Sequence, residues 1–353
     1  MNNTYYQENN RCGLKRADFQ KNIGGKETDL FILTNDNGAE MAITNYGGAI
    51  LAIMVPDKNG KLANVVQGHD NIESVINSPE VFLSTLIGRY GNRIAKGRFQ
   101  LDGKEFKLTI NNGPNSLHGG PTGYHARVWD AQQTSKQSVT LHYLSEDGEE
   151  GFPGNLDITV VYTFTNQNEL VLTYTATTDK ETVINMTNHS YFNLNGDPTK
   201  DIENCILYIN ADNYTPSDST YMTTGEIAKV DNTPMDFRKP TAIGKDVNNF
   251  KFDQIKNANG FDHNWCLNTY KNGTGDDTKV AASLYSPLTG IMLEVYTNEP
   301  GIQVYTGNFL NGKINGKKGI AYNKRAACCL ETQKYPDTPN KKGSYILLLL
   351  STF

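Results

Sequence analysis

An all-β fold, with two or more large antiparallel sheets packed face to face and few short helices, is what this sequence predicts. Three observations support it: alternating or β-branched runs recur along the chain, Asn-Gly and Asp-Gly turns separate them, and helical periodicity is scarce. Hydrophobic residues make up 37% of the 353 residues, and 19 Tyr and 14 Phe are present. The chain therefore has enough apolar material for a sizeable packed core.

The strand candidates are apolar or β-branched runs bounded by Asn, Asp or Gly. We expect strands within residues 29–33, 39–46, 99–108, 156–165 and 169–178. Hairpin turns are expected at residues 36–38, 58–60 and 102–103. The runs 156–165 and 169–178, joined by a short Asn/Gln turn, are expected to pair with each other as a hairpin.

Helical signals are few, and residues 72–78, after the turn at Asp70, form the best short candidate. The chain shows no βαβ alternation, no internal repeat and no Pro/Gly/Ser-rich linker. We therefore expect a single domain over residues 1–353.

Charge and cysteine usage exclude several classes of function. The formal net charge is -5 and the longest terminal apolar stretch, 346–350, is far too short to cross a bilayer, so neither nucleic acid nor a membrane is an expected partner. The five cysteines are scattered, without CxxC or zinc-ligand spacing. We expect a reduced, cytoplasmic protein, unless an export leader precedes Met1.

Two of the six histidines lie in unusually polar surroundings. His118 precedes two glycines, which would let the backbone approach a ligand closely, and His189 lies in a strand-like run of amides and aromatics over residues 185–194. An imidazole that ionises near neutrality is a natural general acid. The alternatives are a turn histidine that caps backbone groups at position 118, which these residues slightly favour, and a hydrogen-bonded structural network at position 189.

Asn92 and Arg93 stand among glycines in the run 88–94. A planar amide and a guanidinium fork suit vicinal hydroxyls or a carboxylate. The commoner role of a single arginine is an exposed ion pair with a surface acid.

Three further polar residues interrupt runs that are otherwise apolar or aromatic. Glu331 follows Cys328-Cys329-Leu330, Asp262 lies beside Phe261, and Gln303 lies between Ile302 and Val304. Acids are seldom buried without a partner, so Glu331 is either a base with a raised pKa or a carboxylate tied to an arginine or backbone donors. Polar, planar and aromatic groups on strands, without a phosphate or metal motif, favour a carbohydrate cleft.

Six ordered motifs resemble those of the aldose 1-epimerase, or galactose mutarotase, family. They lie at residues 88–94, 115–120, 187–194, 260–265, 300–310 and 329–333. The resemblance covers roughly residues 29–337, which makes 1–28 an N-terminal extension and 338–353 an atypical C-terminal end. It implies a β-supersandwich fold and an isomerase that interconverts the α and β anomers of galactose, glucose and similar aldoses.

The resemblance also implies a role for each candidate residue. His189 would be the general acid toward the ring oxygen and Glu331 the general base toward the C1 hydroxyl. The sugar would be held by Asn92, Arg93, His118, Asp262 and Gln303. No cofactor and no metal are expected, the partner is a small aldose, and the chain is expected to be a monomer or a homodimer.

The sequence is also compatible with two other functions. A hexose-6-phosphate epimerase would need extra arginines for the phosphate, and a non-catalytic sugar-binding module would not need both His189 and Glu331. The other four histidines receive no catalytic role: His125 is expected at the surface, and structural roles are expected for His69, His142 and His263.

Overall fold

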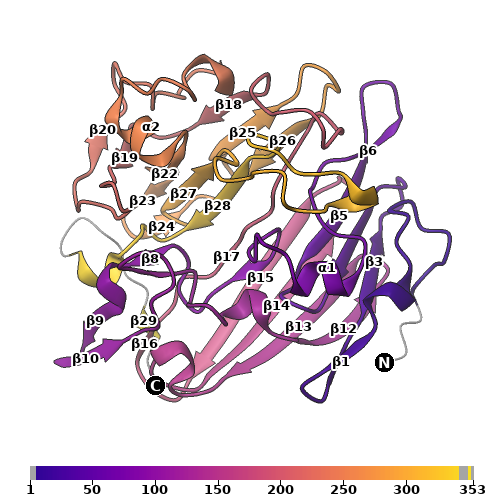
Figure 1. Ribbon diagram of the computed structural model, residues 1–353, viewed down its shortest axis with the longest axis horizontal. Coiled ribbons are helices and arrows are strands. Elements are labelled where there is room, and N and C mark those ends of the chain that lie inside the picture. Colours follow the sequence, from indigo (N-terminus) through magenta and orange to yellow (C-terminus); the bar gives the residue numbers. More distant parts are fainter. Residues whose placement is uncertain (1–4, 342–348, 351–353) are drawn as a thin grey trace.

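Two four-stranded antiparallel sheets form one half of the computed structural model, which describes residues 5–341 and 349–350 (Figure 1). The first sheet consists of β3 (Leu30–Thr34), β4 (Glu40–Thr44), β5 (Ile50–Pro56) and β6 (Leu62–Asn64). The second consists of β12 (Asp130–Ser135), β13 (Ser138–Ser145), β14 (Leu156–Phe164) and β15 (Leu170–Thr178). Apolar side chains from both sheets share one core, as expected for sheets packed face to face.

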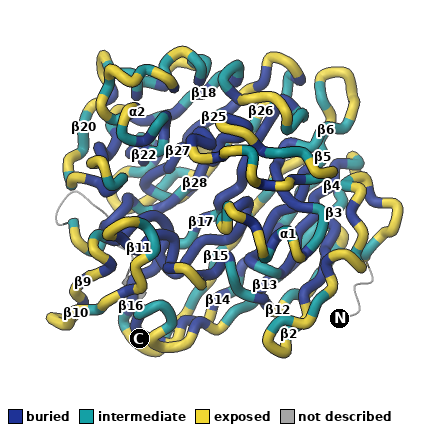
Figure 2. Tube along the Cα trace, viewed as in Figure 1, coloured by how far each residue is buried: buried dark blue, intermediate teal, exposed yellow. Residues whose placement is uncertain are grey.

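The other half of the molecule also consists of two antiparallel sheets. A five-stranded sheet has the order β20 (Ala228–Lys229), β19 (Asn213–Thr215), β22 (Asp262–Cys266), β27 (Gly301–Tyr305) and β28 (Cys329–Gln333). A four-stranded sheet has the order β21 (Thr241–Ala242), β18 (Ile206–Ile209), β25 (Ala282–Tyr285) and β26 (Met292–Val295). Their apolar residues continue the same core, so the buried interior runs through both halves (Figure 2).

Short strand pairs join and flank the large sheets. They are β1 (Lys21–Ile23) with β2 (Lys26–Thr28), β7 (Leu86–Ile87) with β17 (Thr187–Asn188), β8 (Arg93–Ile94) with β11 (Ser116–Leu117), β9 (Arg98–Leu101) with β10 (Lys104–Lys107), β16 (Thr182–Val183) with β29 (Leu349–Leu350), and β23 (Tyr270–Lys271) with β24 (Thr274–Gly275). The two α-helices of the described residues are α1 (Ile72–Ile76) and α2 (Asp253–Ala258). No helix in this part of the chain is long and apolar enough to cross a membrane.

The first sheet is buried on both faces. Successive side chains of a strand point to opposite faces, so Phe31 and Leu33 join the main core while Leu30 and Ile32 point the other way. A second cluster covers that outer face, and the N-terminal segment contributes Leu14 and Phe19 to it, together with two residues of α1. Residues 5–28 of the expected N-terminal extension thus pack onto the body of the fold.

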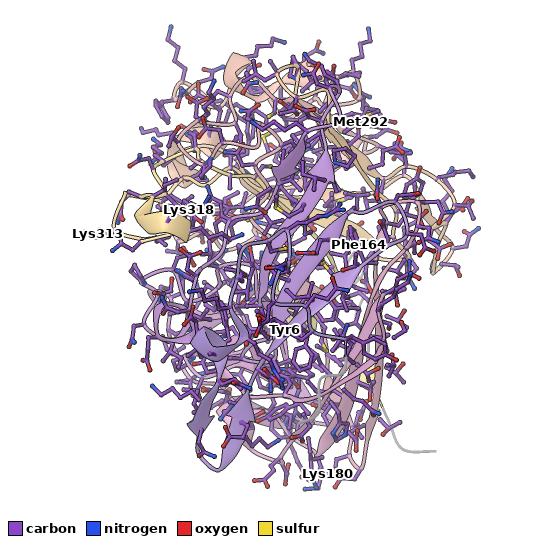
Figure 3. All side chains as sticks on the ribbon, turned by 90° about the vertical axis from the view of Figure 1, so that its right-hand side faces the viewer. Tyr6, Phe164, Lys180, Met292, Lys313 and Lys318 are labelled. Carbon is purple, nitrogen blue, oxygen red and sulfur yellow. The ribbon has the colours of Figure 1, made fainter. Side chains whose placement is uncertain are left out.

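A view turned by 90° from Figure 1 shows that side chains fill the space between the sheets (Figure 3). Phe164, at the end of β14, is buried in the main core, whereas Lys313 and Lys318 project from a loop at the edge of the molecule. Inward-facing residues of the long strands form much of the core, and connecting segments add further buried residues such as Trp129 and Phe237.

The predicted fold class is confirmed, because the chain is mainly strands with two short α-helices. The hairpin of 156–165 with 169–178 is present as β14 and β15, and α1 lies within the predicted helix 72–78. The run 99–108 forms the hairpin β9–β10, turned at Asp102-Gly103. Part of the atypical C-terminal end, residues 342–348 and 351–353, lies outside the described residues, while the backbone of β29 pairs with β16.

Candidate active site

Strands from distant parts of the chain bring the candidate residues together. β17 pairs with β7 and contacts β28, and His189 follows β17 directly. His118 follows β11, which pairs with β8, the strand that begins at Arg93. Glu331 is the central residue of β28. These residues come from four separate regions of the sequence and meet through sheet pairing rather than through chain proximity.

The candidate residues line a pocket of about 370 Å³, a size suited to a small ligand. Its lining residues are Glu80, Phe82, Asn92, Arg93, Asn112, Leu117, His118, His189, Tyr191, Tyr221, Asp262, Tyr305, Phe309 and Glu331. Six of the seven residues expected from the sequence are among them.

A reciprocal pair of backbone contacts fixes Asn92 against His118. The amide of His118 donates to the carbonyl of Asn92 at 3.0 Å, and the amide of Asn92 donates to Nδ1 of His118 at 3.1 Å. Both residues have left-handed backbones, with φ of 60° and 54°, which is uncommon outside glycine. Gly119 follows so close to Gly88 that an added Cβ would lie 1.9 Å from the Gly88 carbonyl oxygen. The glycine after His118 is therefore required by packing.

The Asn92 contact decides the protonation pattern of His118. Because Nδ1 accepts a hydrogen bond, the neutral ring carries its hydrogen on Nε2. Burial lowers the pKa of His118 well below its ordinary value, and the neighbouring His189 lowers it further. His118 is thus held as a neutral donor, which suits a sugar oxygen.

His189 and Glu331 face each other across the pocket floor. Nε2 of His189 lies 3.5 Å from Oε1 of Glu331, and both side chains are buried. Burial lowers the pKa of His189 to about 4 and raises the pKa of Glu331 well above its ordinary value. Nδ1 of His189 and Oε2 of Glu331 have no hydrogen-bond partner among the described residues. Two groups of the pocket therefore have unmet hydrogen-bonding capacity.

Asp262 and Arg93 form a second charged pair in the pocket. Their nearest oxygen and nitrogen are 4.0 Å apart, and the Arg93 side chain is also held by Oδ1 of Asn112 at 2.9 Å and Oδ1 of Asn92. Burial raises the pKa of Asp262, while the charge of Arg93 and a hydrogen bond from Gln303 lower it. The amide of Gln303 donates to Asp262 at 2.7 Å, and Gln303 does not line the pocket. Gln303 therefore contacts Asp262 on the sheet face that it shares with Glu331, without lining the pocket itself.

Aromatic rings cover the rest of the wall. Tyr191 is stacked on His189 with ring centroids 5.1 Å apart, and Tyr305 is stacked with Phe309 at 6.2 Å. The guanidinium of Arg93 lies over the ring of Tyr221 at 5.2 Å. Flat apolar surfaces beside hydrogen-bonding groups are typical of pockets for ring-shaped polar ligands.

His118, His189 and Glu331 also have the composition of a metal site, with one ligand atom from each within 4.8 Å of the others. The tautomer of His118 disfavours this interpretation. Its Nδ1 is occupied by the Asn92 amide and its Nε2 carries hydrogen, so neither nitrogen offers a free lone pair. The cluster is better suited to moving protons than to holding an ion.

Comparison with known proteins identifies the family. The family model described as "Aldose 1-epimerase" matches residues 29–350. The chain belongs to the aldose 1-epimerase family. This confirms the resemblance in the six motifs, and the match extends past residue 337, where the sequence resemblance was expected to end.

Relatives of this aldose 1-epimerase family member match most of its length. The galactose mutarotase of Bos taurus is 42% identical over 90% of this chain and 89% of its own, and the aldose 1-epimerase of Escherichia coli K12 is 36% identical with the same coverage. Among solved structures, the galactose 1-epimerase of Lactobacillus acidophilus has a TM-score of 0.79 and 30% identity, covering 94% of both chains. An aldose epimerase homologue from C. elegans has a TM-score of 0.80 and 28% identity, covering 92% of this chain and 94% of its own.

The structure contradicts the predicted surface position of one histidine. It also places residues on the pocket wall that the sequence did not indicate. His125, expected at the surface, is buried, because its ring packs edge-on against Phe82. His69 and His263 are buried outside the pocket, and His142 is half-buried at the surface. The unexpected lining residues are Glu80, Phe82, Asn112, Leu117, Tyr191, Tyr221, Tyr305 and Phe309. Leu117, Tyr191, Tyr305 and Phe309 lie inside the recognised motifs, whereas Glu80, Phe82, Asn112 and Tyr221 lie outside them and carried no sequence signal.

Proposed function

We propose that this chain is an aldose 1-epimerase that interconverts the α and β anomers of aldohexoses such as galactose and glucose. Family membership and relatives named galactose mutarotase and aldose 1-epimerase support this isomerase activity. The observation that carries the assignment of residues is the 3.5 Å approach of His189 to Glu331 inside a pocket of sugar size.

The reaction needs one proton delivered and one proton removed. Ring opening takes the proton from the C1 hydroxyl, forms the C1 carbonyl, breaks the bond between C1 and the ring oxygen, and gives a proton to that oxygen. Rotation about the C1–C2 bond then exposes the other face of the aldehyde, and reclosure reverses the two transfers. No oxidation or reduction occurs, so an aligned acid and base suffice for this balance.

In our proposal Glu331 removes the proton of the C1 hydroxyl and His189 protonates the ring oxygen. Between them the pair carries one transferable proton, and reclosure returns it. Burial favours the neutral imidazole and the neutral carboxylic acid in the empty pocket. A sugar hydroxyl that donates to Oε2 of Glu331 favours its charged form and lowers its pKa, which leaves the proton for His189.

The remaining pocket residues hold the sugar. His118 donates from Nε2, Arg93 and Asn92 present nitrogen donors, and Asp262 accepts from hydroxyl groups. Gln303 keeps Asp262 in position through its hydrogen bond to the carboxylate. The aromatic rings of the wall exclude water from the apolar faces of the sugar ring.

The experiment is polarimetry of freshly dissolved α-galactose and α-glucose with and without the purified protein. We expect a faster approach to the equilibrium rotation, and the same assay with xylose and arabinose defines the preferred aldose. Sugar binding in calorimetry without faster mutarotation would overturn the proposal in favour of a binding module. Activity restricted to hexose 6-phosphates would overturn it in favour of a phosphosugar epimerase.

Three coarser predictions accompany this function. A cytoplasmic location, a single domain, and a monomeric or homodimeric state follow from the composition and continuity of the chain. Cell fractionation, a single cooperative unfolding transition, and light scattering test them in turn.

A further inference from the structure

Glu80 is a third acid on the pocket wall, beside Asp262 and Glu331. It lies after α1, outside every motif that marks the family in this sequence. Its own carbonyl accepts from the Ser78 hydroxyl at 2.9 Å and from the Leu83 amide at 3.2 Å, which closes a tight turn. The backbone of this turn is therefore fixed, and its acidic side chain faces the cavity.

Glu80 is half-buried, and its carboxyl has no ionic partner among the described residues. No lysine or arginine among the described residues lies within 4.0 Å of its oxygens as an ion pair. Burial raises its pKa to about 7, opposed by hydrogen bonds from the Phe82 amide and the Tyr191 side chain. Its charge acts on Glu331, Tyr191 and Tyr305, which places it on the same side of the pocket as the proposed base.

A purely structural role would give Glu80 firmer partners. The contact from the Phe82 amide to Oε1 is long, at 3.4 Å. Asp337, by contrast, is a buried acid of this fold that accepts from the Ala95 amide at 2.9 Å and from Asn340 at 2.7 Å, and pairs with Lys341 at 3.1 Å. A half-buried acid that is held loosely and faces a ligand pocket is a candidate for ligand contact.

We propose that Glu80 is a substrate-binding and specificity residue, whose carboxyl holds one sugar hydroxyl other than the one at C1. This inference rests on the proposed mutarotase function and extends it. His189 and Glu331 account for the ring oxygen and O1, so a further acid in the same pocket is left to the remaining hydroxyls. A carboxyl that both accepts and donates hydrogen bonds near neutral pH suits a hydroxyl, which does the same.

The test combines a protein series with a sugar series. Glu80→Gln and Glu80→Ala are assayed by polarimetry with glucose and with its 2-deoxy, 3-deoxy, 4-deoxy and 6-deoxy forms. Glu73→Gln is the matched control, because Glu73 lies seven positions earlier with an exposed side chain on α1. We expect Glu80→Ala to raise KM for glucose about tenfold or more with kcat little changed, and Glu73→Gln to leave both unchanged.

The deoxy sugars separate contact from structure. For one of them, wild type and Glu80→Ala should have the same KM, because the hydroxyl that Glu80 holds is already missing. An equal loss in Glu80→Ala across all the sugars would overturn the inference and leave Glu80 a structural residue. Unchanged KM for every sugar would overturn it as well. A wild-type protein without mutarotase activity would refute the function itself, and that result is distinct from both.

Discussion

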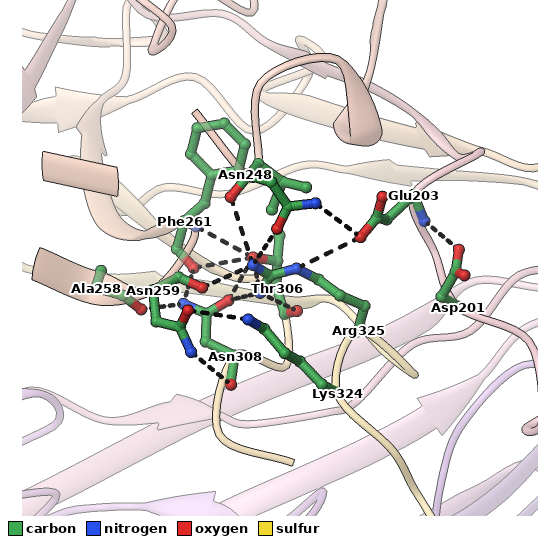
Figure 4. Close-up of polar contacts among 11 residues, drawn as sticks. Asp201, Glu203, Asn248, Ala258, Asn259, Phe261, Thr306, Asn308, Lys324 and Arg325 are labelled. Atoms are coloured by element: carbon green, nitrogen blue, oxygen red, sulfur yellow. Dashed lines mark hydrogen bonds and ion pairs between the residues drawn. The ribbon is translucent and has the colours of Figure 1, made fainter. Parts of the chain in front are cut away.

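Two buried polar clusters of this molecule differ in how fully their polar atoms are hydrogen-bonded by the chain. In the sugar pocket, Nδ1 of His189 and Oε2 of Glu331 have no hydrogen-bond partner among the described residues. The second cluster surrounds Arg325, whose guanidinium donates to the carbonyl of Asn259 at 2.7 Å and of Thr306 at 3.3 Å and to the side chain of Asn308 (Figure 4). The first cluster has unmet hydrogen-bonding capacity beside a cavity, whereas in the second the chain supplies the hydrogen bonds except at Nε of Arg325, which lies 3.9 Å from Oε1 of Glu203.

The Arg325 cluster ties together the loops that lead into the pocket. Asn308 also donates to the carbonyls of Ala258 at 2.7 Å and Phe261 at 2.9 Å, just before Asp262 (Figure 4). Its neighbour Phe309 lines the pocket. The comparison teaches that burial and polarity alone do not mark a functional site, because both clusters have them. Unmet hydrogen-bonding capacity next to a cavity distinguishes the pocket.

The largest expected effect comes from breaking the Arg325 cluster. Arg325→Met should lower the free energy of unfolding by about 3–5 kcal/mol, because it leaves buried carbonyls and Asn308 without their donor. Urea unfolding followed by fluorescence measures this. Lys324→Met, at an exposed neighbouring position, is the control and should cost little. A loss below about 1 kcal/mol would show that the cluster is not a structural unit.

Substitutions at His189 and Glu331 in the pocket should lower catalysis and leave stability nearly unchanged. Glu331→Gln and His189→Asn should each lower kcat by at least about 100-fold, since each removes one proton-transfer group. Their melting temperatures should stay close to that of the wild type, because Nδ1 of His189 and Oε2 of Glu331 have no hydrogen-bond partner to lose in the part of the chain that the structure describes. Polarimetry and thermal unfolding give the two values. A folded variant with a nearly normal rate would remove that residue from the proposed pair.

Substitutions of the sugar-binding residues should have smaller effects than those of His189 and Glu331, and they should change KM rather than kcat. Arg93→Ala and Asp262→Ala should raise KM about tenfold, because each removes a charged hydrogen-bonding group from the wall. Gln303→Leu should have a similar but weaker effect, since it acts through Asp262. Initial-rate polarimetry over a range of sugar concentrations separates KM from kcat. Unchanged values in both alanine variants would contradict the proposed binding role.

The smallest expected effect concerns acid stability next to the pocket. Burial lowers the pKa of His125 to about 4, so the unfolded chain binds a proton below about pH 6.5 that the folded protein does not. Its contribution to stability is therefore present above pH 6.5 and is lost as the pH falls toward 4. Between pH 6.5 and 5.5, His125→Gln should lose about 1 kcal/mol less stability than the wild type in urea unfolding. Equal losses in the two proteins would show that His125 is not held neutral.

Much of the site was accessible from the sequence because its chemistry is carried by unusual residue types in strand-like runs. His189 among amides and Glu331 after an apolar run both contradicted the pattern of a plain core strand, and both line the pocket. Gln303 was predicted to hold the sugar; it lies opposite Glu331 on the same sheet face and donates to Asp262, and it is not among the residues that line the pocket. Its proposed role is now to position Asp262.

The sequence by itself determined the strand-rich fold, the main hairpin and the family, since period-2 patterning, turn residues and motif spacing are local properties. The tertiary structure decided everything that depends on contacts between distant segments. It alone placed Glu80 and Tyr221 on the pocket wall, buried His125 against Phe82, and gave Arg325 its partners. The physical reason is that a side chain's environment in a β fold is set by sheet pairing, which joins residues far apart in the chain.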